Sequence, residues 1–185
     1  MHGAEFSLSI PEKAAQIRLL LTDCDGVLTD AGVYYSANGE ELKRFSLRDG
    51  MGVERLRELA GVETGIITGE NTPIVTRRAE KIHIMEFHLG VKNKKQTLFD
   101  ILERRQLAPE QVAYIGDDMN DEAIMRAVGL SACPADAFED ILQIADYICQ
   151  KNGGHGAFRE FAELIIRAKT NTSYQSLIAS QSITN

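Results

Sequence analysis

Short apolar runs alternate along the chain with longer amphipathic segments. The run at 17–23 is mostly apolar and ends in Asp23, close to Gly26. A short apolar run bounded by turn residues is typical of a strand buried in a parallel sheet. By these criteria we predict strands at 17–23, 62–68, 86–89, 112–116, 130–133 and 147–149.

The segments between these runs carry apolar residues at helical spacing. In one of them Val53, Leu56 and Leu59 recur every three residues, which gives a helix one apolar face. Pro73 stands near the start of another, where a helix tolerates proline. We predict helices at 52–59, 71–81, 93–105, 121–127, 136–145 and 157–169.

This order of elements predicts the fold class. Alternating strands and helices form an α/β, Rossmann-like parallel sheet with helices on both faces. Ligands of such sheets bind at the carboxyl ends of the strands. After the first strand, two extended segments at 33–36 and 41–45 flank the turn signal Asn38-Gly39, which predicts a projecting β-hairpin.

Length and composition are those of one globular domain. The 185 residues, 44% hydrophobic and 25% charged, suffice for a single apolar core. We predict a domain at 17–169, preceded by an N-terminal extension at 1–16. The composition becomes polar at 170–185, which predicts a C-terminal tail outside that domain.

Charge and hydropathy exclude several classes of partner. The net charge is −7 and no long basic run occurs, which argues against binding to nucleic acid. No apolar stretch approaches the roughly 20 residues of a membrane-spanning helix. Because the N-terminus also lacks a secretory signal, we expect a cytoplasmic protein with no membrane partner. Three cysteines without a CxxC pair favour buried reduced thiols: Cys24, Cys133 and Cys149.

Two groups of acidic residues follow predicted strands. Asp23 and Asp25 follow the first strand, and Asp117, Asp118 and Asp121 follow a later one. Because parallel strands end at the same edge of the sheet, these carboxylates should converge there and require a cation. Hard oxygen ligands point to Mg²⁺. The alternative is that the aspartates only cap helices or form turns.

Two further candidates lie near the same predicted edge. The strand at 62–68 ends in Thr68-Gly69, which offers a hydroxyl and close backbone approach to a phosphate oxygen. Lys94, at the start of a predicted helix, can neutralise phosphate charge. Taken alone, each has a simpler explanation, namely a turn and a solvated lysine.

The order Asp-x-Asp-Gly-Val, Thr-Gly, Lys and Gly-Asp-Asp-x-x-Asp resembles the four motifs of the haloacid dehalogenase superfamily of phosphohydrolases. The resemblance implies that Asp23 is the nucleophile and Asp25 the general acid/base. It also implies a phosphoryl group held by Thr68, Gly69 and Lys94, and Mg²⁺ bound by Asp23, Asp25 and Asp117 with support from Asp118 and Asp121.

Two longer segments, 42–52 and 153–160, are similar to the 3-deoxy-manno-octulosonate 8-phosphate phosphatase family. Members of that family lack a cap domain and form tetramers, in which the hairpin and a neighbour's C-terminal tail help to close each active site. The resemblance implies a homotetramer and makes Arg48 and the loop at 153–156 candidates for substrate binding or closure. Equally open is that Arg48 is a surface charge and that the glycines only end a strand.

The residue after the Thr-Gly turn departs from this family. Octulosonate phosphatases usually carry Arg there, whereas this chain has Glu70. Glu70 and the segment 78–81 are similar to relatives that hydrolyse nine-carbon 2-keto-3-deoxy sugar acid 9-phosphates. The resemblance implies that Glu70, Arg78 and Lys81 bind the sugar acid. It favours a nine-carbon substrate (KDN or an N-acylneuraminate), with octulosonate 8-phosphate as the alternative. Each residue alone could instead form a helix-face ion pair.

A function of another class also has to be considered. The segment 128–136 resembles the C-terminal domain of animal N-acylneuraminate cytidylyltransferases, which is phosphatase-like but lacks the catalytic aspartate. A non-catalytic oligomerisation module is therefore the second candidate. The presence of Asp23, Asp25 and Lys94 argues for hydrolysis. A signalling receiver domain would need its phosphoacceptor Asp at a mid-chain strand end, and 86–89 contains none.

Overall fold

A parallel six-stranded sheet organises the chain, of which this computed structural model describes residues 8–170. Leu21 in β1 lies between Gly65 on one neighbouring strand and Tyr114 on the other. All strands therefore end at one common edge. Across the sheet they follow the order β5 (Glu86–His88), β4 (Glu63–Ile67), β1 (Leu19–Thr22), β6 (Val112–Ile115), β7 (Leu130–Cys133) and β8 (Tyr147–Ile148).

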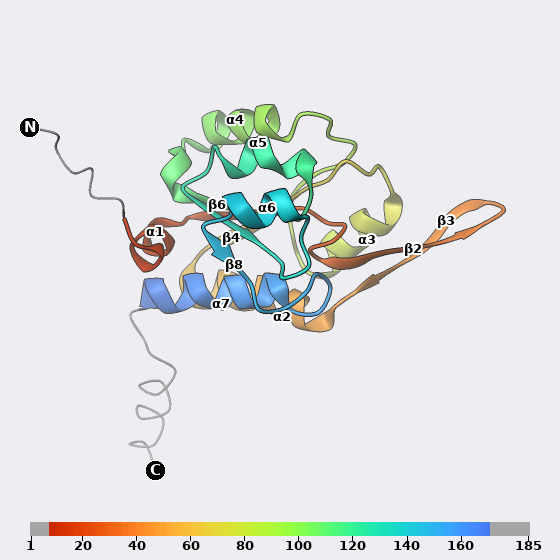
Figure 1. The fold of residues 1–185 in the computed structure, drawn as a ribbon, viewed down its shortest axis with the longest axis horizontal. Helices are drawn as coiled ribbons and strands as arrows, with labels where there is room; N and C mark the ends of the chain where they lie inside the picture. Colours follow the sequence, from red (N-terminus) through yellow and green to blue (C-terminus); the bar gives the residue numbers. More distant parts are fainter. Residues whose placement is uncertain (1–7, 171–185) are drawn as a thin grey trace, which may run out of the picture.

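Helices cover both faces of the sheet, which confirms the predicted α/β, Rossmann-like class. Buried side chains alternate along β1, so that Leu20 packs into one apolar core while Leu19 and Leu21 pack into the other. Figure 1 shows α2 and α7 on one side of the sheet and α4 and α5 on the other. The first core is covered by α1 (Ile10–Gln16), α2 (Leu47–Ala60), α3 (Pro73–Lys81) and α7 (Ala157–Thr170), and the second by α4 (Lys94–Arg105), α5 (Glu122–Met125) and α6 (Glu139–Ile144).

Strands β2 (Thr29–Ser36) and β3 (Gly39–Phe45) form the predicted hairpin, which projects from the body of the molecule in Figure 1. Its turn residues are Ala37 and Asn38, one position earlier than the Asn-Gly signal suggests. Gly39 begins β3 with a φ of +109°, which side chains rarely adopt. Apart from 3₁₀ turns, the hairpin is the only element of residues 8–170 outside the sheet and its covering helices, so this part of the chain has no cap domain.

Helix α2 begins at Leu47 rather than at the predicted residue 52. The side chain of Ser46 accepts hydrogen bonds from two backbone N–H groups of the first turn and thereby caps the helix. Gly50 and Gly52 conceal this turn in the sequence because glycine disfavours helix. Gly52 allows close packing, since a Cβ there would lie 3.1 Å from the Cα of Arg159 in α7.

The short helix α1 was not predicted. It lies in the segment that the sequence suggests is an extension, and it is attached to the domain by polar contacts. Lys13 pairs with Asp146 at 2.6 Å, and the Nζ of Lys169 in α7 donates to the backbone oxygen of Ile17 at 2.8 Å. The last residues before β1 are thus fixed to the helical layer that covers it.

Three other expectations can be compared with the fold. The cysteines are buried free thiols, as predicted. Between residues 8 and 170, no helix combines the length and the apolar character needed to cross a membrane. The predicted extension and tail fall partly on 1–7 and 171–185, which lie outside the described residues, so the domain boundaries stay a prediction.

Candidate active site

The loop after β1 places Asp23 at the carboxyl edge of the sheet. The backbone N–H of Asp23 donates to the carbonyl of Ile115 at 2.9 Å, which extends the pairing of β1 with β6. Gly26 then turns the chain with a φ of +90°. A Cβ at Gly26 would lie 1.9 Å from Asp117 Oδ2, so only glycine allows the loop to approach this carboxylate. Two acidic motifs far apart in sequence are thereby brought together.

Carboxylate oxygens of Asp23, Asp117 and Asp121 lie within 4.8 Å of one another. Burial, together with the charges of Asp23 and Asp121, raises the pKa of Asp117 to about 8. Burial and repulsion from Asp121 raise the pKa of Asp23 to about 7, against the opposing effect of Lys94. Asp117 Oδ1 is buried and has no hydrogen-bond partner among the described residues. A divalent cation with hard oxygen ligands, such as Mg²⁺, fits this donor set because it would satisfy that oxygen and relieve the repulsion.

Asp121 fixes the cluster rather than offering it a free ligand. Oδ1 of its buried carboxylate accepts hydrogen bonds from Lys94 Nζ at 2.7 Å and from the Tyr114 hydroxyl at 2.6 Å. Oδ2 accepts from the backbone N–H groups of Asp117 at 3.0 Å and Asp118 at 3.4 Å. These bonds hold the loop after β6 in place. Free acceptor capacity for a cation therefore remains with the other two carboxylates of the cluster.

Asp118 and Thr68 lie beside this cluster. Asp118 is exposed, and its Oδ1 accepts from the backbone N–H of Met119 at 2.7 Å, which caps the 3₁₀ turn η2 (Met119–Asp121). This is the capping alternative considered for the acidic motif. Thr68 is buried at the end of β4, and its hydroxyl accepts from the backbone N–H of Glu70 at 3.2 Å. A Cβ at the exposed Gly69 would approach other atoms no closer than 3.8 Å, so space for a ligand remains there.

Lys94 is the first residue of α4, and its side chain is only 2% exposed. Its Nζ lies 2.9 Å from Asp23 Oδ1, as an ion pair, and 2.7 Å from Asp121 Oδ1. Burial alone would lower the pKa of Lys94, but the two carboxylates raise it above its ordinary value, so the ammonium stays charged. The alternative of a solvated lysine is therefore wrong.

Asp25 lies outside the cluster of three carboxylates. Its Oδ2 accepts a hydrogen bond from Lys43 Nζ at 2.7 Å, and its Oδ1 accepts one from the Thr29 hydroxyl at 3.3 Å. Both donors belong to the hairpin, one on each strand. The roles of Asp25 as general acid/base and as a metal ligand both stay predictions.

Lys43 and Tyr114 contact the predicted site residues, but the sequence does not reveal either of them. In β3 the lysine is covered while the neighbouring Leu42 is 62% exposed, which reverses the usual pattern of a strand. Tyr114 has the pattern of a core residue in a buried strand. Only tertiary packing shows that these two side chains face carboxylates.

The loop at 153–156 lies directly against the loop that carries Asp23. The N–H of Gly154 donates to the carbonyl of Val27 at 2.9 Å, and a Cβ at Gly153 would lie 1.8 Å from the carbonyl oxygen of Gly26. Arg48 is exposed in the first turn of α2 and lines a nearby groove of about 430 Å³. A role in closure or substrate binding stays a prediction for this loop and for Arg48.

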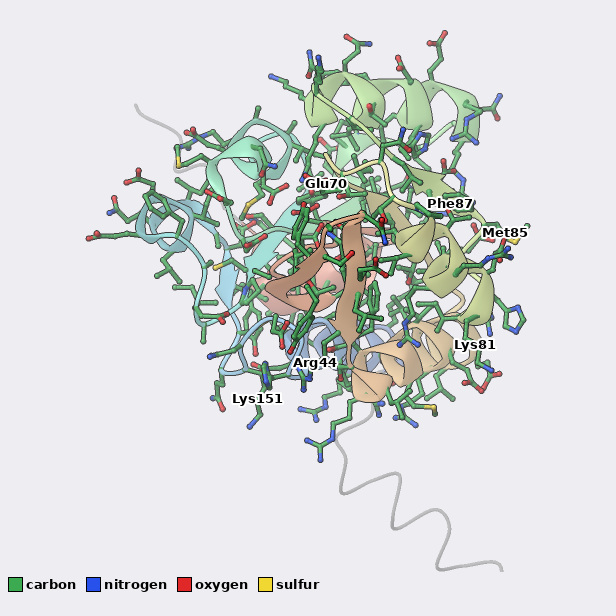
Figure 2. The ribbon with its side chains drawn as sticks, turned by 90° about the vertical axis from the view of Figure 1, so that its right-hand side faces the viewer. Arg44, Glu70, Lys81, Met85, Phe87 and Lys151 are labelled. Carbon is green, nitrogen blue, oxygen red and sulfur yellow. The ribbon has the colours of Figure 1, made fainter. Side chains whose placement is uncertain are left out.

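The other predicted substrate residues lie outside the cluster of three carboxylates, and two of them, Arg78 and Lys81, share a helix and line one groove. Arg78 donates to the carbonyl of Ser46 at 2.8 Å and lies over the ring of Phe45 at 5.5 Å, so it holds the base of the hairpin. Glu70 is exposed beside the carboxyl edge, whereas Lys81 occupies the last turn of α3, which runs away from that edge. Figure 2 shows the two separated. Their contact with a sugar acid stays a prediction.

The two raised pKa values predict how the metal-free protein responds to pH. Asp23 and Asp117 bind protons more tightly in the folded state than in the unfolded chain, where the pKa is about 3.9. Their contribution to stability is therefore fully present below about pH 4 and is lost as pH rises through about 7 and 8. Mg²⁺ should raise the midpoint of thermal unfolding strongly at about pH 8 and little at about pH 5.5.

Calorimetry with Mg²⁺ or with a chelator at both pH values measures this effect. The variant Asp117→Asn should lose most of the Mg²⁺-dependent shift, whereas Asp100→Asn, an equal change of charge on the exposed face of α4, should retain it. A shift of the same size at both pH values would contradict the assignment.

Comparisons with known proteins identify the family of this chain. Residues 66–161 match the family model of haloacid dehalogenase-like hydrolases. The 3-deoxy-D-manno-octulosonate 8-phosphate phosphatase of Salmonella typhi is 42% identical over 163 residues, which cover 88% of this chain and 86% of that protein. A solved structure described as the putative enzyme of this name from Vibrio cholerae has a TM-score of 0.85 at 42% identity, and the match covers 89% of this chain and 91% of that one. The Moraxella catarrhalis enzyme, solved with a magnesium ion, a phosphate ion and KDO, has a TM-score of 0.85 at 34% identity, with coverage of 92% and 97%. The chain therefore belongs to the haloacid dehalogenase-like hydrolase family.

Proposed function

We propose that this protein is a Mg²⁺-dependent 3-deoxy-D-manno-octulosonate 8-phosphate phosphatase. The observation that carries the proposal is the convergence of Asp23, Lys94 and Asp117 at one sheet edge, in a chain 42% identical to a phosphatase of that name over most of both lengths. The same convergence argues against a non-catalytic oligomerisation module, because a purely structural domain gains nothing from three crowded carboxylates, two of them buried.

The comparisons change the expected substrate. Glu70, Arg78 and Lys81 predicted a nine-carbon sugar acid phosphate, but the similar proteins are named for the eight-carbon octulosonate. The structure gives the nine-carbon preference no support, since Arg78 is engaged at the hairpin base and Lys81 lies at the far end of α3. The alternative substrate is therefore the better supported one.

In the first step Asp23 attacks the phosphorus of the substrate. A bond forms between an Asp23 carboxylate oxygen and phosphorus, the bond from phosphorus to the sugar oxygen breaks, and the sugar oxygen takes a proton from Asp25. Lys94 and the Thr68 hydroxyl stabilise the negative charge on the remaining phosphoryl oxygens. A cation held by Asp23 and Asp117 supplies Lewis-acid screening between the anionic nucleophile and the anionic ester.

In the second step water releases phosphate from Asp23. The water oxygen bonds to phosphorus, the bond between phosphorus and Asp23 breaks, and the carboxylate of Asp25 accepts the proton of the water. The proton lost in the first step is thereby regained. The position of Asp25, held by the hairpin outside the three-carboxylate cluster, suits a group that exchanges protons in both steps.

The substrate proposal predicts a clear order of catalytic efficiency. With Mg²⁺ present, kcat/KM for octulosonate 8-phosphate should exceed that for a nine-carbon sugar acid 9-phosphate by roughly 10-fold or more, because a chain length that misplaces the phosphate loses transition-state contacts. A steady-state phosphate-release assay on both substrates measures the ratio. A higher kcat/KM for the nine-carbon substrate would restore the prediction that Glu70 favours such a substrate. Equal rates on all sugar phosphates would contradict a dedicated function.

We propose in addition that the protein acts as a homotetramer in which neighbouring subunits help to close the site. The hairpin supports this assembly because it exposes a run of large apolar side chains that water solvates poorly: Tyr34 is 64% exposed, Tyr35 72% and Leu42 62%. The absence of a cap domain in residues 8–170 leaves the carboxyl edge in need of a cover. The tail that the sequence suggests as a closing element lies mostly outside those residues.

A further inference from the structure

The hairpin carries a covered cation, Lys43, that has no role in the two reaction steps proposed above. The side chain of Lys43 is 1% exposed, although it lies near the surface at the base of a projecting hairpin. Its Nζ is 2.7 Å from Asp25 Oδ2 and 3.7 Å from Glu40 Oε2. Covering an ammonium group costs solvation and side-chain entropy, which only close partners offset. A solvated strand residue would have no need of this arrangement.

Protein donors occupy some acceptor sites of the Asp25 carboxylate and leave others free. Lys43 occupies one acceptor site on Oδ2 and the Thr29 hydroxyl occupies one on Oδ1. A carboxylate has about four acceptor sites, so positions remain free for a leaving oxygen or a water. Two donors on different oxygens fix the plane of the carboxylate. The free acceptor positions on the two oxygens are therefore held in fixed directions.

The Thr29 hydroxyl also takes part in local structure, whereas the Lys43 ammonium has no partner among residues 8–170 other than Asp25 and Glu40. The Thr29 hydroxyl accepts from the N–H groups of Gly26 and Ala31, each at 3.3 Å, and so belongs to the turn itself. Lys43 lies on the second strand of the hairpin, and the whole hairpin turn stands between it and Asp25 in the sequence. Its ammonium is therefore the contact through which the body of the hairpin acts on Asp25.

We propose that Lys43 is a positioning residue that orients Asp25 for proton donation to the leaving oxygen. The inference deepens the proposed phosphatase function and rests on it. Ground-state binding of the phosphate depends on Lys94, Thr68 and the cation, so Lys43 acts on the chemical step rather than on affinity. The position of the hairpin is thereby coupled to the acid/base of the site.

The test compares two leaving groups. A sugar alkoxide must be protonated as it leaves, whereas p-nitrophenolate leaves without a proton. For Lys43→Met, kcat/KM on octulosonate 8-phosphate should fall roughly 10- to 100-fold with KM nearly unchanged. On p-nitrophenyl phosphate the fall should be less than about 3-fold. Lys43→Arg, which keeps the charge, should recover most of the loss.

Control measurements separate positioning from damage to the fold. Arg77→Met removes a cation on the exposed face of α3, which pairs with Glu80 at 3.1 Å, and should leave both activities near wild type. Mg²⁺ affinity, measured by titration calorimetry, should be the same in Lys43→Met as in wild type. Lys43→Gln repeats the comparison if the methionine variant does not fold.

Each outcome decides the inference. An equal loss on both substrates, a loss of Mg²⁺ affinity, or no loss on the sugar phosphate would overturn the positioning role of Lys43 while leaving the phosphatase function intact. Failure of the wild-type protein to hydrolyse any phosphomonoester with Mg²⁺ would instead refute the proposed function, and the inference with it. If the wild type prefers another sugar phosphate, the leaving-group comparison is made on that substrate with the same expected result.

Discussion

Replacing Asp23 by Asn is expected to lower kcat by roughly 10⁴-fold or more while the protein remains folded. Asparagine keeps the size of the side chain but cannot form the bond to phosphorus. The same change removes one charge from the crowded cluster in which burial and Asp121 raise the pKa of Asp23 to about 7. At about pH 8 and without metal, the variant should therefore melt at a higher temperature than wild type.

The pair of measurements distinguishes catalysis from folding. Hydrolysis of p-nitrophenyl phosphate with Mg²⁺ reports the loss of activity, and calorimetry with a chelator reports the gain in stability. Asp100→Asn makes an equal change of charge on the exposed face of α4 and should alter neither. Activity that survives in Asp23→Asn would refute the mechanism and leave the non-catalytic module as the better interpretation.

Replacing Lys94 by Met is expected to damage both activity and stability. The substitution leaves Asp23 and Asp121 buried without their shared cation, and breaking such a pair costs about 3–5 kcal/mol in the free energy of unfolding. Activity should fall by about 10²- to 10³-fold or more because the transition state loses a buried cation. Urea unfolding and phosphate release measure the two effects.

A matched control and a double variant sharpen this result. Lys95→Met removes the next, exposed lysine of α4 and should cost less than about 0.5 kcal/mol. Adding Asp23→Asn to Lys94→Met removes one of the uncompensated charges, so part of the lost stability should return. If Lys94→Met unfolds no more easily than Lys95→Met, the ammonium is not the counter-ion of the cluster.

Most of the fold and the central aspartates could be predicted because both depend on local patterns. Apolar runs of strand length alternate with helical periodicity, and parallel pairing then brings the strand ends to one edge regardless of packing detail. Asp23 and Asp117 could therefore be placed together from the sequence alone. The sequence alone could not show which of the neighbouring aspartates has free oxygens, because a lysine and a tyrosine from other elements saturate one oxygen of Asp121.

The features that could not be predicted depend on tertiary contacts, which produce no periodic pattern in the sequence. Helix α1 is short, and Lys169 of α7 donates to the backbone oxygen of Ile17 directly after it. The start of α2 contains Gly50 and Gly52, of which Gly52 packs closely against Arg159 in α7. Arg78 looks free in the sequence but is engaged by the carbonyl of Ser46. The side chain of Lys43 is covered while its apolar neighbour in the strand, Leu42, is exposed, so hydropathy alone would predict the opposite.

The contact between the loop at 153–156 and the loop that carries Asp23, here called the nucleophile loop, has a consequence for biosynthesis. Asp23 leaves the ribosome early, but the backbone around it is completed by Ile115 and by Gly153 and Gly154, which are synthesised much later. Contacts of such long sequence separation form late and cooperatively. A nascent chain should therefore gain its phosphatase activity only when nearly the whole domain has emerged, and a fragment ending before Gly153 should leave the nucleophile loop unsupported.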